Sequence, residues 1–126
     1  MIEISVIMPV RNEESFIEKA IDSLGSQVNN LHNFQLNVII VDGKSNDRTT
    51  EIAIKKLLEL ESNLFKGVVI TNISGDHSAP SNFNLGYSMV NTEYILRLDG
   101  HTILSKNYIE QCLETFLYIQ KENAFP

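Results

Sequence analysis

The sequence has little cysteine, few basic residues and no long apolar run, and each shortage argues against a class of protein. The single cysteine, Cys112, cannot form an internal disulfide, which favours a reducing compartment. Acidic residues outnumber basic ones, 16 to 10, and the net charge of -6 argues against a nucleic-acid partner, since such proteins carry a basic surface. No stretch is long and apolar enough for a membrane helix, and the N-terminus shows no secretory leader. We therefore expect a cytoplasmic protein, or one held at the cytoplasmic face of the membrane through segments outside this chain.

A glycine-rich phosphate loop is also missing after the first predicted strand. The sequence there reads Pro9-Val10-Arg11-Asn12-Glu13, without a glycine. Dinucleotide-binding folds place a glycine-rich turn at this point, and P-loop nucleotide hydrolases need a glycine-rich loop ending in Lys-Ser or Lys-Thr. The sequence argues against both classes. It also disfavours a nucleotidyltransferase, whose loop after the first strand is generally glycine-rich and basic.

What the sequence does contain is a regular alternation of apolar strands and amphipathic helices. Its 126 residues suffice for one domain with a hydrophobic core, so we treat residues 1–126 as a single domain. We expect strands at residues 4–8, 36–41, 67–71 and 93–98, and helices at residues 13–27, 47–61, 79–90 and from Ser105 onward. Asn12 and Ser105 are the expected N-caps, and Cys112 an expected core residue. Nearly continuous apolar strands separated by helices predict an α/β fold, a three-layer α/β/α sandwich around a mostly parallel sheet.

Polar residues stand at the carboxyl ends of three predicted strands, at residues 9–13, 42–47 and 99–101. Ligands of parallel α/β sheets bind at this edge. Asp99 and His101 are two residues apart on extended chain, so their side chains point the same way and can hold a divalent cation that in turn holds a phosphate. The alternative is an ordinary Asp-Gly turn.

The second cluster separates into a binding candidate and turn residues. The Asp42 carboxylate ends an apolar strand, where it can accept a hydrogen bond from a nucleobase N–H group. Ser45, Asn46 and Asp47 suit turn and helix-capping roles. His77 lies in the polar loop 72–81, and we expect it to be a loop residue without a phosphate contact.

Four blocks of the sequence together resemble the nucleotide-sugar-binding half of a family 2 glycosyltransferase with the GT-A fold. They are residues 6–13, 38–49, 84–86 and 94–101, and they occur in the order of that family. The Asp-Gly-His form of the last block is similar to the branch that builds bacterial exopolysaccharides such as succinoglycan.

The resemblance implies a function and a set of site residues. The implied reaction is the inverting transfer of a sugar from a nucleotide-diphosphate sugar, usually a UDP-sugar, to a saccharide or lipid-linked acceptor in bacterial polysaccharide biosynthesis, with Mn²⁺ or Mg²⁺ as cofactor. Self-association into a homo-oligomer is compatible with it. The implied residues are Pro9, Arg11 and Glu13 for the base and ribose, Asp42 for the base, Asn84 and Gly86 before the metal strand, and Asp99 and His101 for the metal.

The sequence also departs from the family pattern. His101 replaces the last aspartate of the metal motif, Gly43 replaces a frequent second aspartate, and Phe83 stands where many members have an arginine, which predicts a missing phosphate contact. No residue matches the catalytic base. We therefore expect the base and the acceptor-binding part to lie outside this chain, the GT-A fold to be incomplete at the C-terminus, and the chain alone to bind donor but transfer sugar slowly. The alternative is a non-catalytic nucleotide-sugar-binding module or an inactive fragment.

Overall fold

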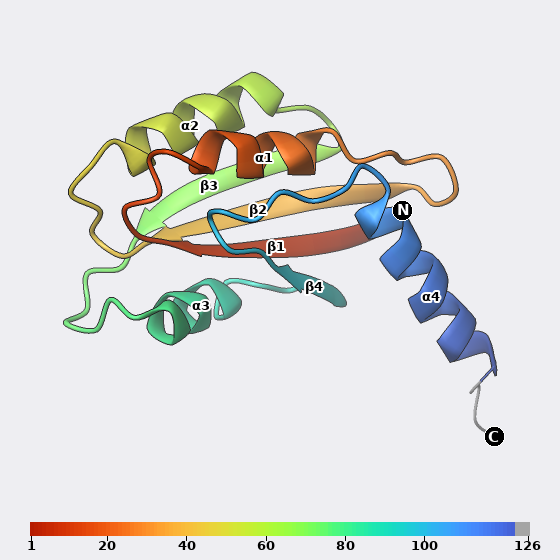
Figure 1. The fold of residues 1–126 in the computed structure, drawn as a ribbon. Helices are drawn as coiled ribbons and strands as arrows, with labels where there is room; N and C mark the ends of the chain where they lie inside the picture. Colours follow the sequence, from red (N-terminus) through yellow and green to blue (C-terminus); the bar gives the residue numbers. More distant parts are fainter. Residues whose placement is uncertain (123–126) are drawn as a thin grey trace.

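A parallel four-stranded sheet forms the centre of the computed structural model, which describes residues 1–122 (Figure 1). Its strands lie in the order β3-β2-β1-β4, and every pairing between neighbours is parallel. Their bounds are Ile2–Val10 for β1, Phe34–Asp42 for β2, Phe65–Thr71 for β3 and Tyr94–Arg97 for β4. Parallel neighbours need a crossover connection, and a helix provides it between successive strands. The predicted α/β class is confirmed.

Helices cover both faces of this sheet. Helices α1 (Ile17–Gly25) and α2 (Thr49–Leu60) lie side by side on one face, and α3 (Ala79–Tyr87) lies on the other (Figure 1). The last helix, α4 (Tyr108–Glu122), packs beside β4, where the ring of Phe116 meets Tyr94 edge to face at 5.4 Å. The three-layer α/β/α sandwich expected from the sequence is confirmed.

The alternation of side chains along the strands divides the core between the two faces. Val6, Met8 and Ile40 are fully buried and join the cluster formed with α1 and α2. Ile7 points the other way, toward α3, where a Cβ atom placed on Gly86 would meet its Cγ2 at 2.7 Å. Each fully buried apolar side chain contributes about 1.5–3 kcal/mol, so both faces stabilise the sheet.

Four local expectations are wrong. Helix α1 begins at Ile17 instead of residue 13, and its N-cap position is Phe16, without a capping side chain. Asn12 has a φ of 52° and bonds a neighbouring loop instead of capping a helix. Helix α4 begins at Tyr108, three residues after Ser105, and Cys112 is exposed instead of buried. Within residues 1–122, no helix has the length and apolar character needed to cross a membrane.

Candidate functional site

A polar pocket of about 340 Å³ lies at the carboxyl ends of β1 and β4. Its lining comes from three segments: Pro9 and Val10 at the end of β1 with Arg11 and Glu13 after it; His77 before α3 with Ala79 and Asn82 in its first turn; and Arg97 at the end of β4 with Asp99, Gly100 and His101 after it. The structure therefore brings together five of the residues predicted from the sequence, namely Pro9, Arg11, Glu13, Asp99 and His101. They meet at the sheet edge where ligands of parallel α/β proteins bind.

Hydrogen bonds fasten the loop after β1 to the loop after β2. The Asn12 N–H donates to Ser45 Oγ at 2.9 Å, and Asn12 Oδ1 accepts from the Asn46 N–H at 2.8 Å. The Glu13 N–H donates to Thr49 Oγ1 at 2.8 Å. Asn12 tolerates the left-handed backbone that this crossing requires, because its short polar side chain bonds locally. These bonds position Arg11 and Glu13, which flank Asn12, at the rim of the pocket.

Asp47 supports the same junction. Its carboxylate accepts hydrogen bonds from the Thr49 hydroxyl, from the Thr49 N–H at 3.0 Å and from the Glu14 N–H at 3.3 Å. Burial acts to raise the pKa of Asp47, but the hydrogen bonds outweigh it and hold the pKa below its ordinary value. The first residue of α2 is thus stabilised by Asp47, in line with the expected capping role, although the N-cap position itself is Arg48.

Two side-chain contacts lie among the residues that line the pocket. His101 Nδ1 lies 3.3 Å from Glu13 Oε1, and Arg97 Nε lies 3.5 Å from Asp99 Oδ1. The side chains of His101, Asp99 and Arg97 are each about half exposed, at 59%, 49% and 46%. Ion pairs of this exposure are weak and exchange readily for other partners. Asp99 and His101 therefore remain available to an incoming ligand.

The donor set of this pocket fits a hard divalent cation held jointly with a phosphate. A carboxylate and an imidazole, Asp99 and His101, face the same pocket. In residues 1–122 no group of three or more His, Cys, Asp or Glu side chains is arranged to hold a metal ion by itself. Mg²⁺ and similar ions are usually held by one or two carboxylates and complete their coordination with substrate phosphates and water. The two donors match that incomplete type of site, although imidazole suits Mn²⁺ better than Mg²⁺.

Asp42 lies at the end of β2, beside the polar pocket, but is not part of its lining. It is 3% exposed, and its carboxylate accepts hydrogen bonds from the Ser45 hydroxyl and the Ser45 N–H. Ser45 thus closes the turn as expected. The next residue, Gly43, has no room for a side chain, since a Cβ atom would lie 2.6 Å from Asn82 Nδ2 and 3.1 Å from the His77 carbonyl. This close approach accounts for the absence of a side chain at residue 43.

Asn84 and Gly86 also lie outside the lining of the pocket. Asn84 is exposed, and Gly86 is buried where α3 packs on the sheet. Asn82 instead is 1% exposed and lines the pocket, with its Oδ1 accepting from Asn72 Nδ2 at 2.8 Å. Helical spacing is the signal that could have identified it, because Asn82 precedes Gly86 by four residues and shares its face, whereas Asn84 does not.

Two further lining residues were not predicted. His77 belongs to the pocket wall, and its Nδ1 is buried without a hydrogen-bond partner. Arg97 brings a guanidinium to the same wall. His77 lies in a loop outside the four sequence blocks, and the block 94–101 contains Arg97 without assigning it a role, because the loop and the end of β4 meet only in the folded chain.

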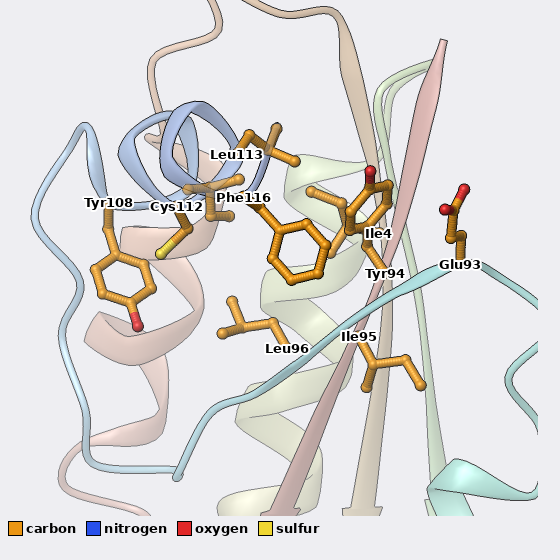
Figure 2. Close-up of a pocket in the computed structure, with 10 residues that line it drawn as sticks. Ile4, Glu93, Tyr94, Ile95, Leu96, Tyr108, Cys112, Leu113 and Phe116 are labelled. Atoms are coloured by element: carbon orange, nitrogen blue, oxygen red, sulfur yellow. The ribbon is translucent and has the colours of Figure 1, made fainter. Parts of the chain in front are cut away.

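A second pocket, of about 380 Å³, is apolar and lies between β4 and α4. Figure 2 shows Tyr94, Leu96 and Phe116 converging on it, with Cys112 at its edge. Glu93 is the one charged residue in its lining. Binding sites for polar ligands need convergent polar groups, so the chemistry of this protein is better sought in the polar pocket.

Comparison with known proteins adds a family assignment to this geometry. The sequence model described as "Glycosyl transferase family 2" matches residues 5–125. One curated relative is a glucuronosyltransferase of Methanococcus voltae, whose name gives dolichyl N-acetyl-alpha-D-glucosaminyl phosphate as its acceptor. It is 28% identical over 94% of this chain and 35% of its own length. The succinoglycan biosynthesis protein ExoA of Rhizobium meliloti is 30% identical over 89% of this chain and 32% of its own. The chain thus spans about a third of the length of these curated relatives.

Solved structures show the same fold. Residues 1–349 of TarS from S. aureus, in complex with UDP, match 95% of this chain and 32% of that one, with a TM-score of 0.76 and 22% identity. Glucosyl-3-phosphoglycerate synthase from Mycobacterium tuberculosis, in complex with Mn²⁺, UDP-glucose and phosphoglyceric acid, matches 78% of this chain and 33% of that one, with a TM-score of 0.52 and 24% identity. At these identities the likeness establishes the fold alone.

Proposed function

Because this chain belongs to glycosyl transferase family 2, we propose that it is the donor-binding part of a glycosyltransferase that uses a nucleotide-diphosphate sugar. The observation that carries the proposal is the polar pocket at the carboxyl ends of β1 and β4, where Asp99, His101 and two arginines converge. We propose a UDP-sugar as donor, which the UDP and UDP-glucose bound by two proteins of the same fold support. The likeness to ExoA supports a saccharide or lipid-linked acceptor in bacterial polysaccharide biosynthesis.

Different residues of the chain would contact different parts of the donor. Pro9, Arg11 and Glu13 would line the base and ribose side, and Asp42 would accept a hydrogen bond from the base. Gly86 would serve this site indirectly, because its missing side chain lets α3 pack against the sheet. The proposed contact of Asn84 with the donor stays a prediction, as does self-association of the protein.

Asp99 and His101 would hold the divalent cation, which supplies positive charge to the leaving nucleoside diphosphate when it is bound. The guanidinium of Arg11 faces the same pocket and can neutralise part of the diphosphate charge. Attack by an acceptor hydroxyl would invert the anomeric carbon. We propose that the base for this step and the acceptor-binding part lie outside this chain, in a protein acting in the cytoplasm or at the cytoplasmic face of the membrane.

A nucleotide panel tests the proposed donor class. UDP, GDP and ADP are titrated into residues 1–126 in the presence of Mn²⁺ while the thermal unfolding midpoint is measured. A bound ligand stabilises the folded state in proportion to the logarithm of its concentration over its Kd. We expect UDP to raise the midpoint and GDP and ADP to raise it less. No effect of any nucleotide at millimolar concentration would contradict the donor site.

A sugar-transfer assay tests whether donor binding lies in this chain and the catalytic base lies outside it. The full-length protein should transfer labelled sugar to an acceptor, whereas residues 1–126 should bind donor and transfer slowly. Robust transfer by residues 1–126 would contradict the proposed position of the base. Donor binding by the full-length protein without any transfer would support a non-catalytic module instead.

A further inference from the structure

We propose that Arg97 contacts the diphosphate of the donor and that the ring of Phe83 positions its guanidinium for that contact. This inference rests on the proposed function, because it assigns a role inside the same pocket. It gives Arg97 a binding role and Phe83 a positioning role. Neither role follows from the motif blocks of the sequence, since the two residues belong to β4 and α3 and meet only in the fold.

The first observation is the stacking of Arg97 on Phe83. Arg97 Cζ lies 5.5 Å from the centroid of the Phe83 ring. The Phe83 ring in turn stacks on Tyr87 of the same helix, with centroids 6.1 Å apart and an interplanar angle of 29°. Cation–π contacts of this length attract the guanidinium to the ring face. The stack therefore restricts a side chain that would otherwise be free to turn into solvent.

The second observation is that Arg97 lines the pocket with a weak charged partner. It is the last residue of β4, about half exposed, and within residues 1–122 its one charged partner is Asp99. That contact, 3.5 Å from Nε to Asp99 Oδ1, is long and solvent-exposed. Guanidinium carries five N–H donors in a planar fork, so donors remain for a ligand.

The third observation is the charge balance of the pocket wall. Its fixed charges are the two arginines, Arg11 and Arg97, and the two carboxylates, Glu13 and Asp99, which cancel when the histidines are neutral. A divalent cation held at Asp99 and His101 would make the pocket positive, which suits an anionic diphosphate. With Asp99 turned toward the cation, the guanidinium of Arg97 would exchange the carboxylate for phosphate oxygens, which it can bind in bidentate fashion.

The decisive variant is Arg97→Gln in residues 1–126, with Arg48→Gln as matched control. Arg48 is an exposed arginine that pairs with Glu51 of α2 and is not among the residues that line the pocket. Calorimetric titrations with UDP and with uridine, both in Mn²⁺, separate the diphosphate from the nucleoside. We expect Arg97→Gln to weaken UDP binding by about tenfold and uridine binding by less than about twofold, because charge-assisted hydrogen bonds to phosphate are lost. Arg48→Gln should change neither.

Substitutions of Phe83 test the positioning role. Phe83→Ala should weaken UDP binding about threefold without affecting uridine, and Phe83→Tyr should restore it, since the ring face is kept. A merely structural role would weaken both ligands alike in Phe83→Ala. UDP binding by Arg97→Gln within about twofold of the wild type would overturn this inference while leaving the donor site intact. Absence of UDP binding by the wild type would overturn the proposed function and this inference with it.

Discussion

His101 Nδ1 lies 3.3 Å from Glu13 Oε1, and this contact joins the turn after β4 to the loop after β1. The glycine between Asp99 and His101 makes the approach possible. A Cβ atom on Gly100 would lie 2.9 Å from Val10 Cγ1 and 3.0 Å from Glu13 Cγ, closer than side-chain carbons tolerate. In the Asp-Gly-His sequence, two candidate metal ligands thus flank a glycine, which is small enough for this turn to pack against the end of β1.

Gly100→Ala should therefore disturb the site. We expect it to lower the free energy of unfolding by about 1 kcal/mol through overpacking and to weaken Mn²⁺-dependent UDP binding several-fold. Chemical denaturation and calorimetry measure the two effects. Gly75→Ala is the control, since no atom lies within 4 Å of a Cβ atom there. Wild-type behaviour of Gly100→Ala in both measurements would contradict the close packing of this turn.

Removing the proposed metal carboxylate should abolish the response to metal. In Asp99→Asn, UDP binding should be the same with and without Mn²⁺, because the neutral amide is a poor ligand for a hard cation. Calorimetric titration of UDP with and without about 1 mM Mn²⁺ measures how much the metal changes the affinity for UDP. Glu51→Gln, on the exposed surface of α2, should keep the wild-type response. A variant at Asp99 that still gains affinity from Mn²⁺ would exclude this residue as a ligand.

Substitution of Asp42 should weaken the nucleoside itself, independently of metal. Asp42→Asn should reduce uridine binding by about tenfold, since a charged hydrogen-bond acceptor for the base is lost. Glu51→Gln, on the exposed surface of α2, is the control and should leave the affinity for uridine unchanged. Equal uridine affinity in Asp42→Asn and the wild type would show that Asp42 serves the turn alone.

The fold was largely predictable because apolar strands and the helical spacing of apolar residues are both visible in short stretches of the sequence. The helix starts were not. Residues 13–16 have helical composition, yet the Glu13 N–H donates to Thr49 Oγ1 at the start of α2, and α1 begins at Ile17. Bonds between residues that lie 36 positions apart leave no signal in the local sequence. Cys112 likewise follows an amphipathic pattern but lies on the exposed side of α4.

The candidate site was predictable in part, for a related reason. Residues that follow a strand directly, such as Arg11, Glu13 and Asp99, are placed at the pocket by the topology of a parallel sheet. The position of Asn82, and the contact of Arg97 with Phe83, depend on how α3 packs against β1 and β2. That packing is set by tertiary contacts such as the approach of Gly86 to Ile7, which no motif records.

The pH dependence of stability should reveal the role of Asp47. The hydrogen bonds to its carboxylate hold the folded-state pKa of Asp47 below its ordinary value, so the stabilisation from the ionised carboxylate is complete above the unfolded pKa and is lost as the pH falls through the folded pKa. Asp47→Asn should therefore be less stable than the wild type by about 1 kcal/mol at pH 7. Denaturation between pH 7 and about pH 3 should show this difference shrinking below the unfolded pKa. A difference that stays constant over that range would contradict the role of the carboxylate charge.

The central claim is a metal-assisted site for a nucleotide-diphosphate sugar at the carboxyl ends of β1 and β4. The most direct test is calorimetric titration of UDP-glucose into residues 1–126 with Mn²⁺ and again with a chelator in its place. Binding that is at least about tenfold tighter with Mn²⁺ is the expected result, because phosphate oxygens complete the coordination of a cation for which the chain offers two donors. Absence of binding at millimolar UDP-glucose, or equal affinity with and without Mn²⁺, would contradict the claim.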